Sequence, residues 1–443
     1  MTRRLPVIAL GVLIVGLALH NLAMATLWEW GLRGTALDVV AAWKEVLLAL
    51  ALSVAVWHAR RLPALRAADL LAAVYAGIVL VYALIPQDWL DGAATTRGEL
   101  LALRHHLTPV AAYALGRLLV TTARERRWLL WLAAGVGGAL AIWGFADAYL
   151  VPLQWWRDSG VPGWYGEQLG LDYKGLSGLP ENWVYNTGDE SNPLRRLVST
   201  FLSPLATAYV LVVVLLILAA RRPTRWTVAT GLVCYAGLLW THTRAALLAL
   251  SAGLVVLALL QRRWWPVMAA AASLAAAFVF VKAYPTIGPS TSYTQAELAY
   301  LREHARQEGG TAGDPLSPGE SSVASHWRNL RDGVETVLRH PQGYGLGNTG
   351  VTAKRTGVEI KAGESTYTEL GVDAGLLGAA AFVAWCIALL LALRRRPGLA
   401  AAFAAVLVLG LQSDVIGIHW LAFCVWAGVG VGVTAATREE QTF

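Results

Sequence analysis

Four groups of polar residues stand at the ends of long apolar runs, where their types and spacing suit phosphate chemistry. They are Arg195 with Arg196, then Arg244, then Arg328, and finally Glu364 with Ser365, Tyr367 and Glu369. A guanidinium offers five donors in a planar fork, which suits bidentate recognition of a phosphate. Several arginines near one carboxylate would therefore hold a pyrophosphate and leave a general base, Glu364, beside it.

Each of these residues also has a simpler interpretation. Arg195 and Arg196 would also suit contacts with lipid headgroups, and Arg328 could be solvated on an exposed helix face. Glu364 could be an ordinary loop carboxylate. Arg244 is the hardest to dismiss, because it stands in a loop of only a few residues between two apolar runs.

Other polar residues favour structural roles. Lys44 and Glu45 lie inside an apolar run and could form a buried pair. Asp414 and His419 stand near a helix junction, where capping is the expected role. His340 precedes a proline and so ends a helix.

The stretch 340–348 contains three glycines at alternate positions, Gly343, Gly345 and Gly347. Glycine permits positive φ and close backbone approach, so this pattern predicts a tight, shaped loop rather than a tether. Glu364 follows this loop and stands at the mouth of the apolar run 370–393. A carboxylate there needs partners or a wet cavity.

Composition indicates what positions these residues. The chain has 443 residues, of which 56% are hydrophobic and only 15% are charged. Apolar runs of membrane-spanning length recur along it, so we predict an all-α polytopic membrane protein with about twelve transmembrane helices. The predicted spans are 6–27, 37–57, 68–85, one ending near 120, 128–150, 204–220, two meeting at 241–244, 265–283, 370–393, and two within 399–433.

The arginines set the predicted topology. Basic runs follow every even-numbered span, and arginines also precede the first span, which we interpret as uncleaved. Both termini are therefore predicted to be cytoplasmic. The net charge of +7 is a topology signal, and no nucleic-acid partner is expected. Cys234, Cys386 and Cys424 lie inside apolar runs and are expected to be packing residues.

This topology divides the chain into three parts. Residues 1–283 hold nine spans and an outer loop at 151–199, residues 284–368 form a large periplasmic loop, and residues 369–443 hold the last three spans and a cytoplasmic tail. The large loop should contain short helices at 295–307 and 322–338, separated by a turn-rich, mobile stretch at 309–317. In the helix at 322–338, Val323, Trp327, Leu330, Val334 and Val337 form an apolar stripe, which Arg328 does not share.

Aromatic residues are frequent in the loop 151–199. They would suit stacking on sugars or an interfacial aromatic belt, and the sequence alone does not decide between the two. The residues concerned are Trp155, Trp156, Trp164, Tyr165 and Trp183.

The order of these features resembles the bacterial O-antigen ligase and O-antigen polymerase superfamily of GT-C-type membrane glycosyltransferases. The resemblance in topology covers nearly the whole chain. The matching motifs are 196–201 with Pro204, then Thr243-Arg244, then a tryptophan-containing helix, a Pro-x-Gly-x-Gly-x-Gly turn at 341–347, and a Tyr-x-x-Leu-Gly run at 367–371 that continues to Gly378. One difference is informative: ligases of this superfamily usually carry a His-Asn or similar pair where this chain has Glu364-Ser365, and this favours the polymerase side.

The resemblance implies glycosyl transfer in the bacterial inner membrane. The expected partners are a polyprenyl-pyrophosphate-linked glycan donor, a glycan or glycolipid acceptor, and membrane lipids. We expect a metal-independent, inverting hexosyltransferase without a cofactor, because the leaving group is already a good one and the sequence shows no metal-ligand cluster. Glu364 is the predicted base, and Arg195, Arg196, Arg244, Arg328, Ser365 and Tyr367 are the predicted substrate-binding residues.

The most favoured activity is an O-antigen or exopolysaccharide polymerase. The alternatives are an O-antigen ligase, a protein O-oligosaccharyltransferase and, from another class, a lipid or oligosaccharide transporter. A transporter should show repeats with broken helices and charge near the middle of the membrane, whereas the polar residues here gather at span ends.

Overall fold

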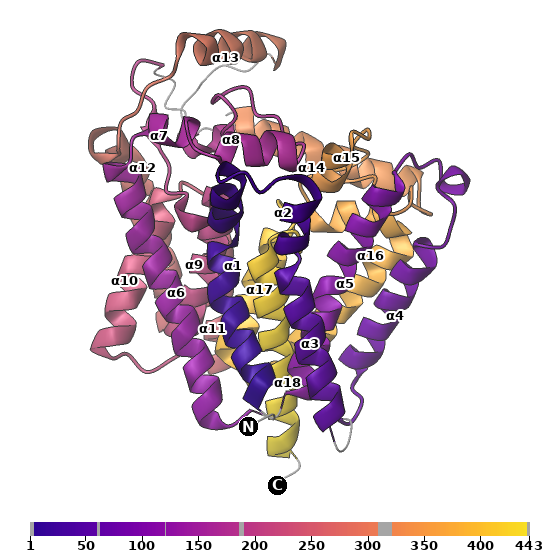
Figure 1. Cartoon of the computed structure of the whole chain (residues 1–443). Coiled ribbons are helices and arrows are strands. Elements are labelled where there is room, and N and C mark those ends of the chain that lie inside the picture. Colours follow the sequence, from indigo (N-terminus) through magenta and orange to yellow (C-terminus); the bar gives the residue numbers. More distant parts are fainter. Residues whose placement is uncertain (1–3, 60–62, 120, 186–189, 309–320, 441–443) are drawn as a thin grey trace.

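The computed structural model of the protein describes residues 4–59, 63–119, 121–185, 190–308 and 321–440. Helices make up most of this part of the chain (Figure 1). The strands it contains are β1 (Val184–Tyr185) and β2 (Leu194–Arg195), which pair antiparallel. The predicted all-α class is therefore confirmed for the described residues.

Each of the predicted spans is helical. The long helices are α1 (Leu5–Glu29), α2 (Gly34–Ala41) continued by α3 (Trp43–His58), α4 (Ala67–Tyr82), α5 (Thr96–Leu118), α6 (Ala123–Leu150), α9 (Pro204–Ala219), α10 (Arg225–Trp240), α11 (Arg244–Gln261), α12 (Trp265–Ile287), α16 (Thr366–Ala392), α17 (Pro397–Leu409) and α18 (Trp426–Glu440), the last preceded by the π turn η6 (Leu421–Val425). Among the described residues, 6 helical stretches are long and apolar enough to cross a membrane, and shorter apolar helices accompany them. The protein is thus a multi-pass membrane protein, while the number of twelve spans stays a prediction.

The shorter elements lie in the connections. They are η2 (Gln87–Leu90), α7 (Leu153–Arg157), α8 (Val161–Gly163), η3 (Trp164–Gln168), η4 (Glu181–Trp183), η5 (Ser199–Phe201), α13 (Gln295–Glu308), α14 (Ser321–Arg339) and α15 (Gly350–Thr356). Helices α13 and α14 confirm the two helices predicted in the large loop. The stretch predicted to be mobile between them, 309–317, lies outside the described residues.

The long helices run between two ends of the bundle (Figure 1). Both chain termini lie at one end, which we call the terminal end, and α7, α8, α13, α14 and α15 cover the other, which we call the loop end. The large loop runs from 288 to 365, slightly shorter than the predicted 284–368, because α12 continues to Ile287 and α16 begins at Thr366. The two termini thus share a side, and which side of the membrane this is stays a prediction.

The aromatic residues of the loop 151–199 form a small core of their own. Trp156, Trp164, Tyr165 and Trp183 are buried there, and only Trp155 among the five predicted residues is exposed. Trp183 Nε1 and the Tyr165 hydroxyl both donate to the carbonyl of Leu202. Sugar stacking and an interfacial belt are therefore both wrong for these four residues, since burying such large rings stabilises the loop itself.

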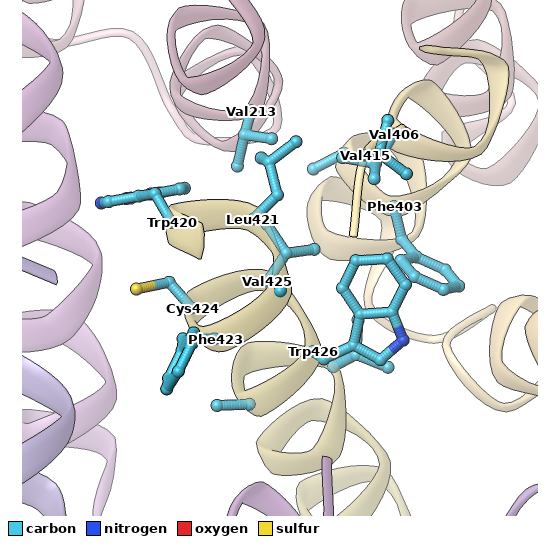
Figure 2. Close-up of a cluster of buried hydrophobic side chains, with 14 of the residues drawn as sticks. Val213, Phe403, Val406, Val415, Trp420, Leu421, Phe423, Cys424, Val425 and Trp426 are labelled. Atoms are coloured by element: carbon cyan, nitrogen blue, oxygen red, sulfur yellow. The ribbon is translucent and has the colours of Figure 1, made fainter. Parts of the chain in front are cut away.

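The main core fills the centre of the bundle, where α9, α17 and α18 meet (Figure 2). Trp420, Phe403 and Trp426 are buried in it, and Trp420 Nε1 donates to the carbonyl of Ile14 on α1 at 3.0 Å. Cys424 belongs to the same core, and all three cysteines are buried with free thiols. Their predicted packing role is confirmed.

Helix α16 is interrupted near Gly375, where the backbone angles are not helical. The glycine-rich turn supplies partners for the groups that this break leaves unpaired. Tyr344 N–H donates to the carbonyl of Val372 at 2.7 Å, and Leu376 N–H donates to the carbonyl of Pro341 at 2.8 Å. A broken membrane helix is tolerated where protein groups satisfy its backbone, so the turn and the break stabilise each other.

The turn can approach this closely because of its glycines. Gly343, Gly345 and Gly347 have φ of 75°, 91° and 93°, which confirms the predicted left-handed conformations. A Cβ at Gly343 would lie only 2.6 Å from the backbone nitrogen of Gly375. The break thus fixes where the glycine-rich turn meets α16, about eleven positions after Glu364 in sequence.

Candidate active site

Glu364 lies at the loop end, in the last turn of chain before α16. Its side chain is 40% exposed, and its backbone is left-handed, with φ 69°. His326 Nδ1 on α14 donates to Glu364 Oε2, and Asn329 on the same helix also hydrogen bonds to this carboxylate. The hydrogen bond from His326 lowers the pKa of Glu364 below its ordinary value. The carboxylate is therefore ionised at neutral pH and able to accept a proton.

Helix α14 brings His326 and Asn329 to this position because it packs tightly on α16. Val337 is buried, and a Cβ at Gly371 of α16 would lie 2.6 Å from its methyl group. Two other residues of the predicted apolar stripe, Trp327 and Val334, are exposed, Trp327 at 69%. The stripe is therefore divided between a face on α16 and a face outside the bundle, and the sequence pattern did not indicate this division.

Ser365 and Tyr367, both predicted to bind substrate, are occupied by contacts with the bundle. Ser365 is buried, and its hydroxyl donates to the carbonyl of Gly410 at 3.1 Å. The Tyr367 hydroxyl donates to the carbonyl of Leu407 on α17 at 2.7 Å. These contacts anchor the start of α16 and thereby the backbone that carries Glu364. A role in substrate binding stays a prediction for both.

Arg196 joins β2 to the turn between α10 and α11. Its Nε donates to the carbonyl of Thr241 at 2.7 Å, and its Nη2 donates to Thr243 Oγ1 at 3.2 Å. Burial lowers the pKa of Arg196 to about 10, and the like charge of Arg244 acts in the same direction. Arg196 and Arg244 are therefore close in space, as predicted, although 48 positions separate them in sequence. Arg244 itself is exposed at the first position of α11.

The other two predicted arginines have different surroundings. Arg195 is buried, pairs with Asp147 of α6 at 3.2 Å and also donates to the carbonyl of Val151. A buried guanidinium held by a carboxylate stabilises the fold, so the structure gives Arg195 a structural role and does not bring it to an exposed surface. Arg328 is exposed on α14, two positions from His326. Its role in donor binding stays a prediction.

Hydrogen bonds through the loop between α17 and η6 connect Tyr209, a neighbour of Arg196, with the start of α16. Arg196 lies within electrostatic range of Tyr209 on α9, and the Tyr209 hydroxyl contacts Ser413 Oγ at 2.6 Å. Thr366 Oγ1 donates to the carbonyl of Ser413 at 2.9 Å. Thr366 stands two residues after Glu364. The loop between α17 and η6 therefore joins the two halves of the candidate site.

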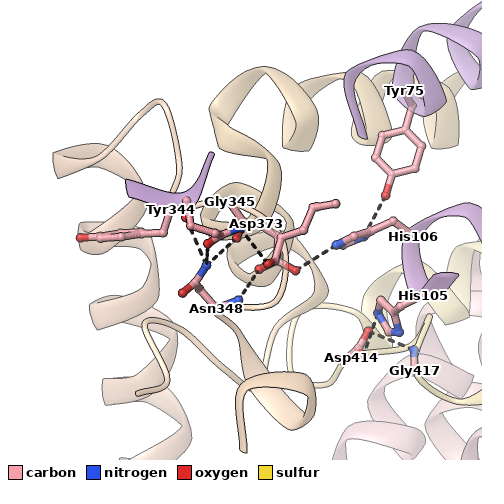
Figure 3. A network of polar contacts seen from close by, with 11 residues as sticks. Tyr75, His105, His106, Tyr344, Gly345, Asn348, Asp373, Asp414 and Gly417 are labelled. Atoms are coloured by element: carbon pink, nitrogen blue, oxygen red, sulfur yellow. Dashed lines mark hydrogen bonds and ion pairs between the residues drawn. The ribbon is translucent and has the colours of Figure 1, made fainter. Parts of the chain in front are cut away.

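A second polar layer lies beside the glycine-rich turn (Figure 3). The Tyr75 hydroxyl contacts His106 Nδ1, and His106 Nε2 contacts Asp373 Oδ2 at 3.0 Å. Asn348 N–H donates to the other oxygen of Asp373 at 3.3 Å. This layer holds the turn against α5 and α16. We did not predict this layer from the sequence, although His106 inside a membrane helix was a usable signal.

The other polar residues singled out from the sequence are part of the framework. Lys44 is buried and lies 3.5 Å from Glu45, as predicted for a structural pair. Asp414 accepts from Gly417 N–H at 3.1 Å, which is a local cap, and also contacts His105 at 3.2 Å. His340 stacks on the ring of Tyr344 at 4.3 Å. None of these contacts adds a group to the pair formed by Glu364 and His326.

The fold and these contacts define a multi-pass helical membrane protein with a hydrogen-bonded carboxylate and two neighbouring arginines at its loop end. Residues 229–383, from α10 into α16, match the family model described as O-antigen ligase. The resemblance to the O-antigen ligase and polymerase superfamily is thereby confirmed for this part of the chain, which contains Arg244, Arg328 and Glu364. The family implies a glycosyltransferase-like enzyme that acts on lipid-linked glycans. No curated protein matches the sequence.

Proposed function

We propose that the protein transfers a glycan from a polyprenyl-pyrophosphate donor to the hydroxyl of an acceptor sugar, at the outer face of the bacterial inner membrane. The observation that carries this proposal is the position of Glu364. It is an ionised carboxylate held by His326 and Asn329 at the mouth of a membrane helix, inside the region that matches the O-antigen ligase family. Arg196 and Arg244 are neighbours, and the residues on either side of Arg196 hydrogen bond to the carbonyls of Pro289, just after α12, and Trp240, at the end of α10.

The proposed step is a single displacement. Glu364 takes the proton from the acceptor hydroxyl, and the acceptor oxygen forms a bond to the anomeric carbon of the donor. The bond from that carbon to the pyrophosphate oxygen breaks, and the polyprenyl pyrophosphate leaves with the electron pair. Attack from the face opposite the leaving group inverts the anomeric carbon. Positive charge near the leaving group stabilises the developing negative charge.

The two arginines have distinct roles in this proposal. Arg196 is positioned by the α10–α11 turn through Nε and Nη2, and its Nη1 contacts the pyrophosphate. Arg244 is exposed at the first position of α11, so its guanidinium can approach a phosphate at the membrane surface. A helix N-terminus also favours an anion through its unpaired N–H groups and dipole.

The favoured activity is polymerisation of an O-antigen or exopolysaccharide repeat, because Glu364-Ser365 replaces the pair usual in ligases. Deletion of the gene followed by gel analysis of glycolipids tests this choice. Collapse of the ladder to a single repeat unit supports a polymerase. Loss of all surface polymer, with lipid-linked polymer accumulating, supports a ligase instead.

The interrupted helix α16 is an observation that favours a transporter, since transporters bind substrate at broken helices. Here the chain's own glycine-rich turn occupies the break through Tyr344 and Pro341. Purified protein in detergent distinguishes the two classes, because glycosyl transfer needs no sealed compartment. Conversion of a lipid-linked donor and an acceptor glycan in detergent supports an enzyme, and transport in vesicles without any conversion contradicts the proposal.

A further inference from the structure

A mostly apolar cavity of about 360 Å³ lies at the terminal end, opposite the candidate active site. It runs between α1, α6, α9, α17 and α18, and its walls include residues within 126–133, 213–220 and 428–435. Each of these ranges covers seven residue-to-residue steps along a helix, and at 1.5 Å per residue this gives the cavity a depth of about 10 Å. The cavity therefore extends from the surface of the bundle into the part that lies in hydrocarbon.

Positive charge gathers at one end of this cavity. Arg126, Arg221, Arg395 and Arg396 line it, and among the described residues of its wall none is acidic. Arg126 is held by the carbonyl of Thr121, to which Nη1 donates at 2.8 Å, and Arg221 lies over the ring of Trp131 at 5.9 Å. Arg126 lies in the first turn of α6, Arg221 just after α9, and Arg395 and Arg396 between α16 and α17, so all four stand at helix ends, where lipid headgroups are expected.

The deeper wall is apolar. Val213, Trp420, Cys424 and Val425 belong to it and also to the central core (Figure 2). Gly428 also lines the cavity, about one turn after Val425, and a Cβ built there would meet a methyl of Leu399 at 3.8 Å. A narrow apolar space with guanidinium groups at its mouth matches a molecule with an anionic head and a hydrocarbon tail.

We propose that this cavity binds an anionic phospholipid of the leaflet at the terminal end. One acyl chain occupies the apolar space, and the phosphodiester contacts the arginines. Basic pockets between membrane helices recognise anionic lipid headgroups in this way, and guanidinium groups suit phosphate oxygens. A zwitterionic lipid matches the apolar space but not the charge, and a free phosphate matches the charge but not the space. The site is separate from the proposed glycosyl transfer at the loop end.

The charge is tested with full-length protein stripped of lipid in detergent. Binding of short-chain phosphatidylglycerol and phosphatidylcholine is measured by native mass spectrometry. We expect phosphatidylglycerol to bind the wild type more tightly and Arg126→Ala/Arg221→Ala to weaken it about 30-fold, from roughly fivefold per arginine. The control Arg124→Ala/Arg222→Ala removes the same charge from exposed arginines outside the cavity, and its affinity should stay near that of the wild type.

The cavity itself is tested at Gly428. Gly428→Leu should fill the space and abolish binding, whereas Gly428→Ala adds one methyl that the wall accommodates and should bind like the wild type. Size-exclusion profiles establish that both variants fold. Three results would each overturn the proposal. The first is equal affinity of the wild type for the two lipids, and the second is an equal loss of phosphatidylglycerol affinity in the two double-arginine variants. The third is stabilisation of the protein by inorganic phosphate alone that persists in Gly428→Leu.

Discussion

Replacement of Glu364 by glutamine is the sharpest test of the proposed base, because it keeps the shape of the side chain and removes its basicity. The carboxylate accepts hydrogen bonds from His326 and Asn329. A hydrogen bond to a charged group contributes about 1.5–3 kcal/mol, and one between neutral groups about 0.5–1.5 kcal/mol. The Glu364 side chain is 40% exposed, so solvent screening reduces the difference. We expect Glu364→Gln to fold with a loss below about 1 kcal/mol.

The effect on the rate should be much larger. Loss of a general base typically slows a reaction by about 10²–10⁴-fold, which corresponds to roughly 2.7–5.4 kcal/mol of the barrier. The assay is single-turnover transfer from a polyprenyl-pyrophosphate donor to an acceptor glycan, with donor binding measured separately. The variant should bind donor normally and transfer at least about 10²-fold more slowly. Glu359→Gln is the matched control, since this carboxylate is in the same loop and its side chain is 77% exposed.

Turnover of Glu364→Gln near the wild-type rate would refute the assignment of the base. Glu369 and His340 would then be the next candidates from the sequence, and His326 would be the candidate from the structure. With its proton on Nδ1, neutral His326 has an unprotonated Nε2 that can accept a proton. We also expect Glu364→His to be the best tolerated substitution, because the resembling ligases place histidine in this region.

Two further substitutions, one pH profile and one labelling experiment test the remaining arguments. Arg244→Lys should lower transfer at least about tenfold at normal expression, because a point charge does not replace the bidentate fork; full activity would indicate simple charge attraction or a lipid contact. Gly343→Ala should destabilise the protein by more than about 2 kcal/mol in thermal unfolding, since φ of 75° is unfavourable for alanine and its Cβ would lie 2.6 Å from Gly375. Because the pKa of Glu364 is lowered in the folded protein, its contribution to stability is present above about pH 4.3 and is lost as the pH falls through the folded value. If Glu364 is the base, the transfer rate should therefore stay unchanged from pH 7 to pH 5. A loss of transfer centred near pH 6 would instead indicate that an imidazole is the base. Cysteines introduced at Glu359 and Arg222 should react with impermeant reagent from opposite sides, because the native cysteines are buried; labelling of both from one side would contradict the topology.

Local features of the chain could be predicted from the sequence because they depend on neighbouring residues. Hydropathy over about 20 residues predicts a membrane helix, and every predicted span is helical. The alternate glycines predicted positive φ at Gly343, Gly345 and Gly347, and the structure has it at each. Glu364 could be selected because a carboxylate at the mouth of an apolar run is costly without partners.

What those partners are could not be read from the sequence. His326 stands 38 positions before Glu364, on the loop helix α14, and its register depends on the close packing of Val337 against Gly371. The same limit explains Arg195. An arginine at a span end is equally suited to a phosphate, a headgroup or a buried partner, and only the packing of α6 brings Asp147 within 3.2 Å of it.

The interruption of α16 and the cavity at the terminal end were also decided by tertiary structure alone. Hydropathy predicts a continuous helix through Gly375, and the break exists because a turn about 30 positions earlier in sequence satisfies its backbone groups. The cavity needs five helices to leave the same space unfilled, and no stretch of sequence contains that information. Hydrophobic pattern and backbone preference are properties of neighbouring residues, whereas proximity between distant side chains depends on how the helices pack.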